Sequence, residues 1–181
     1  LLIDTDLDAE QHDYARTIRD SGDALLEIIN DILDFSKIEA GQMDIETHPF
    51  DLRDCIESAL DLISSKAAEK QLDIAYIYED SVPAAIGADL TRLRQILLNL
   101  LSNAVKFTQE GEVVLSVSAT PVSKGVVELT FTVRDTGIGL TEAGMSRLFQ
   151  SFSQADSSTT RKYGGTGLGL AVVWNILLDH K

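Results

Sequence analysis

The chain has 181 residues, of which 44% are hydrophobic, and 29 acidic against 15 basic residues give a formal net charge of −14. This length suits one compact domain, or one domain with an appendage, and the apolar fraction is normal for a protein that buries a core. The acidic balance argues against nucleic acids and anionic membrane surfaces as partners, because both bind to clustered Lys and Arg side chains.

Residues 8–40 are predicted to form one long helix. Small and apolar residues recur in alternating steps of three and four, which is a heptad seam: Ala15, Ile18, Gly22, Leu25, Ile29, Ile32 and Ser36. Other apolar residues widen the seam on both sides: Tyr14, Ile28, Phe35, Leu26 and Leu33. One helix cannot bury so broad a stripe, which therefore predicts partner helices in a four-helix bundle. We interpret residues 1–7 as the end of a preceding helix with a polar turn at 4–6, and Gly41 as the cap that ends the long helix.

The remaining chain alternates strands and helices, which indicates an α+β domain beginning near residue 42. A strand at 42–47, ending at Pro49, precedes a helix from Leu52 to about Lys70. That helix has Asp51 as its N-cap and an inward face of Ile56, Leu60 and Ile63. We then expect a strand at 72–78, a helix at 90–107, a hairpin of strands 111–120 and 126–134, a short helix at 141–149, a polar loop at 153–165 and a final helix at 168–178.

The helix at 90–107 carries the first candidate site residues. Leu93, Leu97, Leu101 and their apolar neighbours share one face, whereas the opposite face presents Asn99, Asn103 and Lys106. Two amide side chains one turn apart can offer neutral oxygen ligands to Mg²⁺, and Lys106 can offset phosphate charge. The alternative is ordinary polar surface or capping.

Two glycine-bearing segments supply further candidates. Asp135 follows a strand and begins the turn Asp-Thr-Gly-Ile-Gly, where its carboxylate can accept a hydrogen bond from an exocyclic amine; the alternative is a tight turn closed by a bond from Asp135 to its own backbone. The run Gly165-Thr-Gly-Leu-Gly169 opens a helix, whose free N–H groups favour an anion; the alternative is a flexible hinge. Between these segments, Phe149 and Phe152 are read as core residues or as the anchor of a mobile lid, and Arg161 and Lys162 as phosphate contacts or solvated charges.

In combination these segments resemble the motifs of sensor histidine kinases, in their order along the chain. Residues 94–108 (RQILLNLLSNAVKFT) resemble the asparagine box, 135–139 (DTGIG) the first glycine box, 148–156 (LFQSFSQAD) the phenylalanine box and 165–169 (GTGLG) the second glycine box. Residues 30–41 (NDILDFSKIEAG) are similar to the end of the dimerisation helix that precedes the ATP domain of this family. The resemblance extends to about residue 171 and is typical of hybrid kinases.

The resemblance implies a two-layer α/β sandwich of the type shared with gyrase, Hsp90 and MutL ATPases, at residues 42–181, preceded at 1–41 by part of a helical-hairpin dimerisation domain. It implies ATP and Mg²⁺, with the metal on Asn103 and Asn99, the adenine amine on Asp135 and Lys106 near the phosphates. The other expected nucleotide contacts are Gly137, Ile138, Gly139, Phe149, Phe152, Arg161, Gly165, Thr166, Gly167, Leu168 and Gly169. Residues 154–164 correspond to the ATP lid.

Two departures from the family pattern affect the expected function. The phosphoacceptor histidine of the family lies on the first hairpin helix, so we expect none in this chain: His12 has the wrong spacing, and His48 and His180 lack the surrounding motif. After residue 171 the family's basic residue, Gly-Gly pair and two final strands are not visible, so the last strands are expected to be absent.

The expected reaction is transfer of the ATP γ-phosphoryl group to a histidine on the missing helix, for relay to an aspartate of a response regulator. Sister ATPases have a Glu where Asn99 stands, and an amide cannot accept a proton from water, which favours kinase over hydrolase. A non-catalytic ATP-binding and dimerisation module and an ATPase of the same fold stay open as alternatives.

Partners and location follow from the same observations. We expect a homodimer through residues 1–41 and a receiver domain, in the same chain or another, as the second partner. Because no run of about 20 apolar residues is present, we expect no membrane insertion by this segment. Cys55 is the only cysteine and is interpreted as a buried structural thiol, consistent with a reducing, cytoplasmic location whether or not the parent protein has a membrane anchor.

Overall fold

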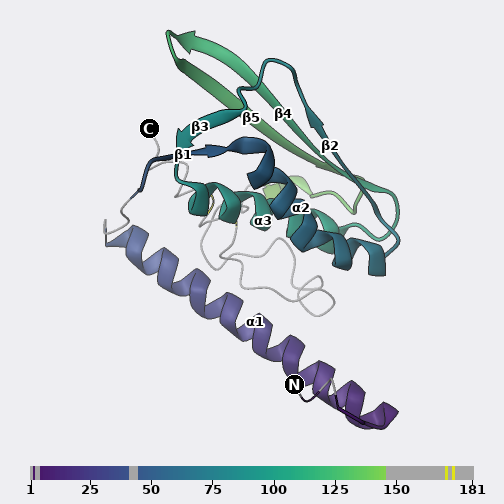
Figure 1. Cartoon of the computed structure of the whole chain (residues 1–181). Coiled ribbons are helices and arrows are strands. Elements are labelled where there is room, and N and C mark those ends of the chain that lie inside the picture. The colour runs from purple at the N-terminus through teal and green to yellow at the C-terminus, as the bar shows by residue number, and fades with distance from the viewer. Residues whose placement is uncertain (1, 3–4, 41–44, 146–169, 171–172, 174–181) are drawn as a thin grey trace. The chain divides into compact units, whose positions relative to one another are not determined.

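The computed structural model describes residues 2, 5–40, 45–145, 170 and 173. The chain divides into two compact units, residues Leu1–Met43 and Asp44–Lys181, which we describe separately. Figure 1 shows the first unit as a single long helix and the second as helices packed on a sheet.

The first unit consists of helix α1, Ala9–Glu39, so the helix predicted at 8–40 is confirmed. The residues at its N-terminus form a capping box: the Asp8 carboxylate accepts a hydrogen bond from the Gln11 N–H at 2.8 Å, and the Gln11 side chain accepts one from the Asp8 N–H at 3.2 Å. The N–H and the hydroxyl of Thr5 both donate to the Leu2 carbonyl, which is consistent with the polar turn expected at 4–6. Gly41 lies outside the described residues.

The predicted heptad seam lies on the surface of α1. Ile18 is 70% exposed, and the other apolar members with described side chains are also exposed: Leu25, Leu26, Ile28, Ile29, Ile32 and Leu33. Ala15 is the buried member. This helix therefore carries an apolar stripe that its own unit does not cover within the described residues.

The second unit is a two-layer α/β sandwich, which confirms the predicted α+β class. A three-stranded sheet has the order β2-β4-β5, with β2 (Asp73–Tyr78) parallel to β4 (Glu112–Ser123) and β4 antiparallel to β5 (Val126–Asp135). Helices α2 (Leu52–Glu69) and α3 (Leu90–Phe107) cover one face of this sheet. A second, two-stranded sheet pairs β1 (His48–Asp51) with β3 (Ala85–Ala88).

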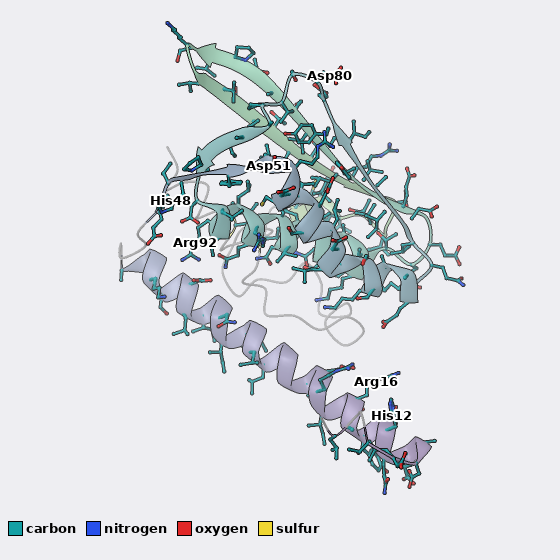
Figure 2. The ribbon with its side chains drawn as sticks, in the orientation of Figure 1. His12, Arg16, His48, Asp51, Asp80 and Arg92 are labelled. Atoms are coloured by element: carbon teal, nitrogen blue, oxygen red, sulfur yellow. The ribbon has the colours of Figure 1, made fainter. Side chains whose placement is uncertain are left out.

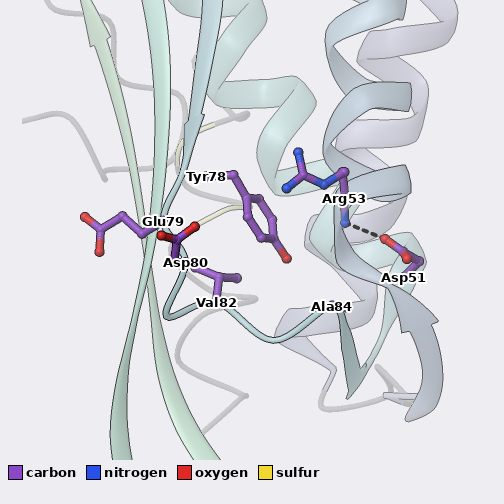
Figure 3. A pocket seen from close by; sticks show the side chains of 7 residues that line it. All are labelled: Asp51, Arg53, Tyr78, Glu79, Asp80, Val82 and Ala84. Carbon is purple, nitrogen blue, oxygen red and sulfur yellow. Dashed lines mark hydrogen bonds between the residues drawn. The ribbon is translucent and has the colours of Figure 1, made fainter.

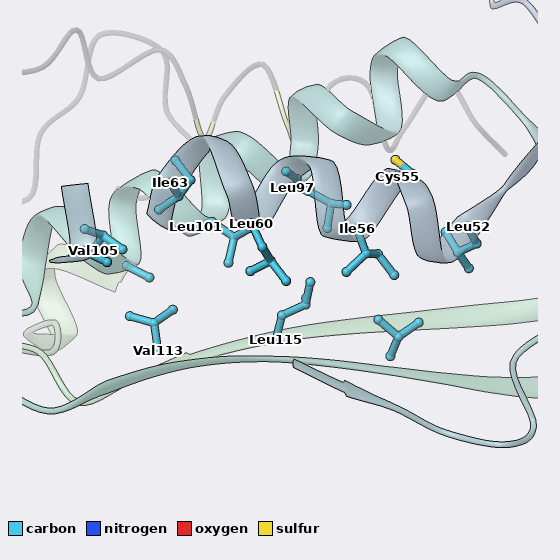
Figure 4. Close-up of a cluster of buried hydrophobic side chains, with 14 of the residues drawn as sticks. Leu52, Cys55, Ile56, Leu60, Ile63, Leu97, Leu101, Val105, Val113 and Leu115 are labelled. Carbon is cyan, nitrogen blue, oxygen red and sulfur yellow. The ribbon is translucent and has the colours of Figure 1, made fainter. Parts of the chain in front are cut away.

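The core lies between the two helices and the sheet (Figure 4). Alternate residues of β4 (Val113, Leu115 and Val117) are completely buried, as period-two burial on one face of a strand predicts. They face the buried sides of α2 and α3, to which Leu52, Ile56, Leu60, Ile63, Leu97, Leu101 and Val105 contribute. The inward face predicted for α2 is thus confirmed.

Cys55 is buried in this core at 1% exposure, as predicted for a structural thiol. Burial raises the pKa of the Cys55 thiol, and the nearby charge and hydrogen bond of Arg94 oppose this rise only in part. A raised pKa keeps the side chain protonated and unreactive.

The first strand was predicted at the wrong position. Residues 45–47 are not in a strand, and β1 comprises His48–Asp51, with Pro49 inside it rather than after it. Pro49 pairs with Gly87 of β3, and among the described strands β1 has no second neighbour. It is therefore an edge strand, where a proline is tolerated. Strand β3, which determines where β1 pairs, was not predicted from the sequence.

The hairpin is confirmed, with strands longer than predicted. A two-residue turn at Lys124 and Gly125 joins β4 and β5, and Gly125 has a φ of 76° that suits glycine. The register shifts between Pro121 and Ser123 near this end. Helix α4 is described as Glu142–Met145, within the helix predicted at 141–149. The predicted loop at 153–165 and most of the final helix lie outside the described residues, but Leu170 and Val173 are helical and Val173 is buried.

Candidate functional site

The polar face of α3 carries the first group of predicted site residues. Asn99 and Asn103 are half-buried and lie one helical turn apart. Within the described residues, neither side-chain amide takes part in a hydrogen bond, although half-buried amides usually find partners. Lys106 is half-buried on the same helix, with its Nζ 5.4 Å from the centre of the Phe107 ring. Amide oxygens are suitable ligands for a hard cation, so this donor set fits Mg²⁺.

The N-terminus of α3 is capped by a buried carboxylate. Asp89 Oδ1 accepts a hydrogen bond from the Arg92 N–H at 3.0 Å, and Oδ2 accepts one from the Glu46 N–H at 3.2 Å. Burial by itself raises the pKa of Asp89, but hydrogen bonds from the backbone of Arg92, Glu46 and Thr91 and the charge of Arg92 lower it below its ordinary value. Asp89 therefore fixes both the start of α3 and the segment that precedes β1.

The turn at 135–139 leaves the end of β5 and is closed by its own aspartate. Asp135 Oδ1 accepts a hydrogen bond from the Gly137 N–H at 2.9 Å, so the tight-turn interpretation is confirmed. This bond occupies one carboxylate oxygen, and Asp135 is exposed. Within the described residues the other oxygen has no partner, so it is available to an exocyclic amine.

A backbone hydrogen bond brings this turn to α3. The Ile138 N–H donates to the Phe107 carbonyl, the last residue of α3, at 3.3 Å. A Cβ on Gly137 would lie 2.5 Å from the same carbonyl oxygen, which excludes any larger residue without movement of the backbone. The turn thus contacts α3 one helical turn beyond Asn103, so Asp135 lies in the segment that docks at the end of α3 where Asn103 and Lys106 are found.

Thr136 ties the turn to the loop between α3 and β4. Its hydroxyl donates to the Glu110 carbonyl at 3.2 Å and accepts from the Glu112 N–H at 3.0 Å. Gly111 adopts a φ of 109° beside this hydroxyl, and a Cβ there would lie 2.2 Å from Thr136 Oγ1. The sequence analysis did not assign a role to Thr136 or Gly111.

A lysine that the sequence analysis passed over closes the C-terminal end of α3. Lys70, at the end of α2, donates from Nζ to three backbone carbonyls: those of Val105, Lys106 and Thr108. The only local signal was a lysine after a helix, which is too common to single out.

The second half of the predicted site lies outside the described part of the chain. Its residues are Phe149, Phe152, Arg161, Lys162, Gly165, Thr166, Gly167, Leu168 and Gly169. Of the histidines, His12 lies near the start of α1 and His48 begins β1, where its Nε2 is 3.7 Å from the exposed Glu46 carboxylate (Figure 2). His180 also lies outside the described residues.

A separate pocket of about 260 Å³ lies at the C-terminal end of β2 (Figure 3). Its lining includes Asp51, Arg53, Tyr78, Glu79, Asp80, Val82 and Ala84. The Arg53 guanidinium carbon lies 4.3 Å from the centre of the Tyr78 ring, and the Tyr78 hydroxyl donates to the Pro83 carbonyl. Tyr78 pairs with Val117 in the middle of β4, whereas Asp135 pairs with Val113 near its start, so this pocket is distinct from the predicted nucleotide site.

Two kinds of feature are absent from the residues that the structure describes. Among them, no three His, Cys, Asp or Glu side chains are grouped so that they could hold a metal ion. No helix in that part of the chain combines the length and the apolar character that crossing a membrane requires.

Comparison with known proteins gives two family matches. Residues 88–181 match the family described as histidine kinase-, DNA gyrase B- and HSP90-like ATPase, and residues 1–41 match the His kinase A (phospho-acceptor) domain. The first match includes α3, the 135–139 turn and the second glycine-rich segment, and it covers more than half of the chain.

Individual relatives are also similar over most of this chain. Hybrid signal transduction histidine kinase A of Dictyostelium discoideum is 45% identical over 98% of the chain, and the sensor protein GacS of Pseudomonas syringae pv. syringae is 46% identical over 95%. The chain covers only 8% and 19% of these two proteins, respectively. Among solved structures, full-length ShkA in complex with AMPPNP is 39% identical with a TM-score of 0.74, and the match covers 97% of this chain and 35% of ShkA.

Proposed function

The chain belongs to the sensor histidine kinases, and on that premise we propose that it is the ATP-binding catalytic part of a larger kinase, which transfers the γ-phosphoryl group of ATP to a histidine. The observation that supports this most strongly is the arrangement at the end of α3. Two half-buried amides without partners among the described residues, a lysine and an exposed carboxylate come together there, and a backbone hydrogen bond joins their two segments.

We assign the metal to the amide side chains. Asn99 and Asn103 would hold Mg²⁺ through their oxygens without adding negative charge beside a triphosphate. Bound there, the ion would supply charge neutralisation to the phosphates, which is most of what phosphoryl transfer needs besides positioning. Lys106 would add a second positive charge on the same helix.

We assign the exposed carboxylate of Asp135 to recognition of the adenine base. The oxygen of Asp135 that is not bonded to the Gly137 N–H would accept a hydrogen bond from the exocyclic amine of adenine. The turn bond holds the carboxyl group in one orientation, so less rotational freedom is lost on binding. Gly137, Ile138 and Gly139 would line the same side, and the predicted residues 149–169 would complete the phosphate site.

The larger protein would supply the remaining parts. We place the domain boundary after residue 41 and assign residues 1–41 to dimerisation, because the apolar stripe of α1 is exposed in its own unit and the segment matches the phosphoacceptor-domain family. A response-regulator receiver domain would accept the phosphoryl group from the histidine, and we place this segment in the cytoplasm. None of the three histidines of the chain is assigned as phosphoacceptor.

Calorimetric titration of the chain with ATP in the presence of Mg²⁺ tests the nucleotide site. We expect saturable uptake at one site per chain that weakens strongly when Mg²⁺ is removed. Well-folded protein that releases or absorbs no heat on titration would contradict the proposal.

The reaction is tested separately with γ-labelled ATP. We expect acid-labile label to move onto a histidine-bearing dimerisation helix of a related kinase when that helix is added, with little free phosphate released. Rapid phosphate release without any labelled histidine would favour the ATPase alternative, and tight ATP binding with neither outcome would favour a non-catalytic module.

A further inference from the structure

Lys70 makes an unusual number of contacts to a single helix end. Its Nζ lies 2.7 Å from the Val105 carbonyl oxygen, 2.9 Å from that of Lys106 and 3.1 Å from that of Thr108. An ammonium group has three protons, so these bonds use its complete donor capacity. The contact spans 35 to 38 residues of sequence and joins the end of α2 to the end of α3.

The end of α2 is shaped so that Lys70 can reach α3. Helix α2 ends in a Schellman-type turn, in which the Leu72 N–H bonds back to the Ala67 carbonyl and the Gln71 N–H to that of Ala68. Gln71 adopts a left-handed conformation with a φ of 58°, and the buried Leu72 anchors the chain behind it. The backbone on both sides of Lys70 is therefore fixed.

The carbonyls that Lys70 binds are those of Val105 and Lys106 in the last turn of α3 and that of Thr108, the C-cap residue of the helix. The Phe107 carbonyl, the remaining one of the last four, accepts a hydrogen bond from the Ile138 N–H. Helix ends normally leave these four acceptors without intrahelical partners and carry partial negative charge. Here the Lys70 ammonium group and the Ile138 N–H bond to neighbouring carbonyls of the same helix end. The end of α2 and the 135–139 turn are therefore both fixed to the end of α3.

We propose that Lys70 is a positioning residue of the nucleotide site. It acts through the backbone of α3: by holding the last turn, it sets where Lys106 stands and where the 135–139 turn with Asp135 docks. Its charge also offsets the negative end of the helix, which would otherwise oppose a triphosphate nearby. This inference rests on the proposed function and adds to it a residue outside the motifs that the sequence analysis identified.

If Lys70 were only a structural cap, its replacement would give a different result from the one expected for a positioning residue. Loss of a cap lowers the stability of the folded state, but the protein that remains folded binds nucleotide as before. Loss of a positioning residue weakens binding by folded protein and loosens the Ile138–Phe107 hydrogen bond locally. The two roles are therefore separated by measurements made well below the unfolding temperature of every variant.

The test compares Lys70→Met, which keeps the aliphatic stem without donors, with Lys70→Arg and with the control Lys66→Met. Lys66 is exposed in the same last turn of α2 and bonds to no carbonyl of α3 among the described residues. At a temperature where circular dichroism shows all variants folded, we expect Lys70→Met to weaken Mg–ATP binding about tenfold, equivalent to about 1.4 kcal/mol. Lys70→Arg should recover most of the affinity, and Lys66→Met should match the wild type.

Amide hydrogen exchange supplies the second readout. We expect faster exchange of the Ile138 amide in Lys70→Met, with the Leu115 amide in the middle of β4 unchanged. If Lys70→Met does not fold, Lys70→Gln takes its place with the same expectations. Equal Mg–ATP affinity in the wild type, Lys70→Met (or Lys70→Gln) and Lys66→Met would overturn this inference and leave the proposed function unaffected. Absence of uptake by the wild type would overturn the proposed function, and the inference with it.

Discussion

Asn103 shows at the scale of one residue how chemistry and position combine in this site. It is half-buried on α3, its amide has no hydrogen-bond partner among the described residues, and the next turn of the helix carries Lys106 and the carbonyl that receives Ile138. A structural asparagine in such a place would normally be bonded. Its amide is thus better explained as a ligand for something that binds than as part of the folded framework.

Replacing Asn103 by Asp tests this explanation. The substitution keeps the shape of the side chain but adds a negative charge where the triphosphate is proposed to lie, so we expect ATP affinity to fall by about tenfold or more. Because the position is only half-buried, we expect stability to change by no more than about 1 kcal/mol. Calorimetry and urea denaturation measure the two effects, and Asn30→Asp on α1 adds the same charge outside the proposed site. Unaltered affinity in Asn103→Asp would argue against the ligand role.

Gln71 is a second informative residue, because it is the only described residue other than glycine with a positive φ. A side chain in this left-handed conformation costs energy that glycine avoids. We expect Gln71→Gly to stabilise the protein by about 0.5–1 kcal/mol, as read from the urea midpoint. Glu69→Gly, two residues earlier in helical conformation, is expected to destabilise by about 1 kcal/mol. A lower midpoint in Gln71→Gly would contradict the account of the α2 terminus.

At the scale of elements, α3 depends on distant segments at both of its ends. Asp89 caps the first turn and also holds the Glu46 N–H, and Lys70 and Ile138 satisfy the last turn. The helix therefore keeps its place through bonds to the segment before β1, to the end of α2 and to the turn after β5. The side-chain amides of Asn99 and Asn103, between these ends, take no part in these bonds that hold the helix.

The Asp89 cap makes a prediction about stability and acid. Asp89→Ala removes both acceptors and should cost about 1–2 kcal/mol, whereas Asp89→Asn keeps a good capping side chain and should cost less. Because the folded protein lowers the pKa of Asp89 from its ordinary value of 3.8, its contribution is present above that value and is lost as the pH falls through the lower folded pKa.

Urea denaturation in a series of buffers measures this contribution. We expect the difference in stability between wild type and Asp89→Asn to shrink as the pH falls below about 4. Asp54→Asn is the control, since Asp54 is exposed in the first turn of α2. A difference that is constant across the acidic range would show that the charge of Asp89 is not what stabilises α3.

At the scale of the whole molecule, nucleotide binding should be linked to the stability of one unit. The proposed ATP contacts lie in residues 44–181, while α1 belongs to the other unit. A ligand present at 100 times its dissociation constant adds about 2.7 kcal/mol to the state that binds it. We expect Mg–ATP to protect the amides of β4 and α3 from hydrogen exchange by this amount and to leave those of α1 unaffected. Equal protection of α1 would show that the two units unfold together.

Much of the secondary structure could be read from local sequence. The periodicity of residues 90–107, the Asp51 cap and the glycine turn at 124–125 each act over a few residues, and the corresponding elements are confirmed. Local sequence did not predict the position of β1 correctly. The bounds of this short strand depend on its pairing with β3, and no local pattern indicated β3. The proposed site residues on α3 and at Asp135 could be predicted because motif spacing is a property of the sequence.

The amino-acid sequence by itself determined the helices and the strands other than β1 and β3, the family that the chain resembles and which amide, acidic and glycine residues are candidates for a nucleotide site. Only the tertiary structure decided that Asp89 bonds to Glu46, that Lys70 crosses to the end of α3 and that Ile138 docks the glycine turn on Phe107. The physical reason is range. Periodicity and capping arise between residues a few positions apart, whereas these bonds join residues 31 to 43 positions apart, and only the packing of helices on the sheet brings them within hydrogen-bonding distance.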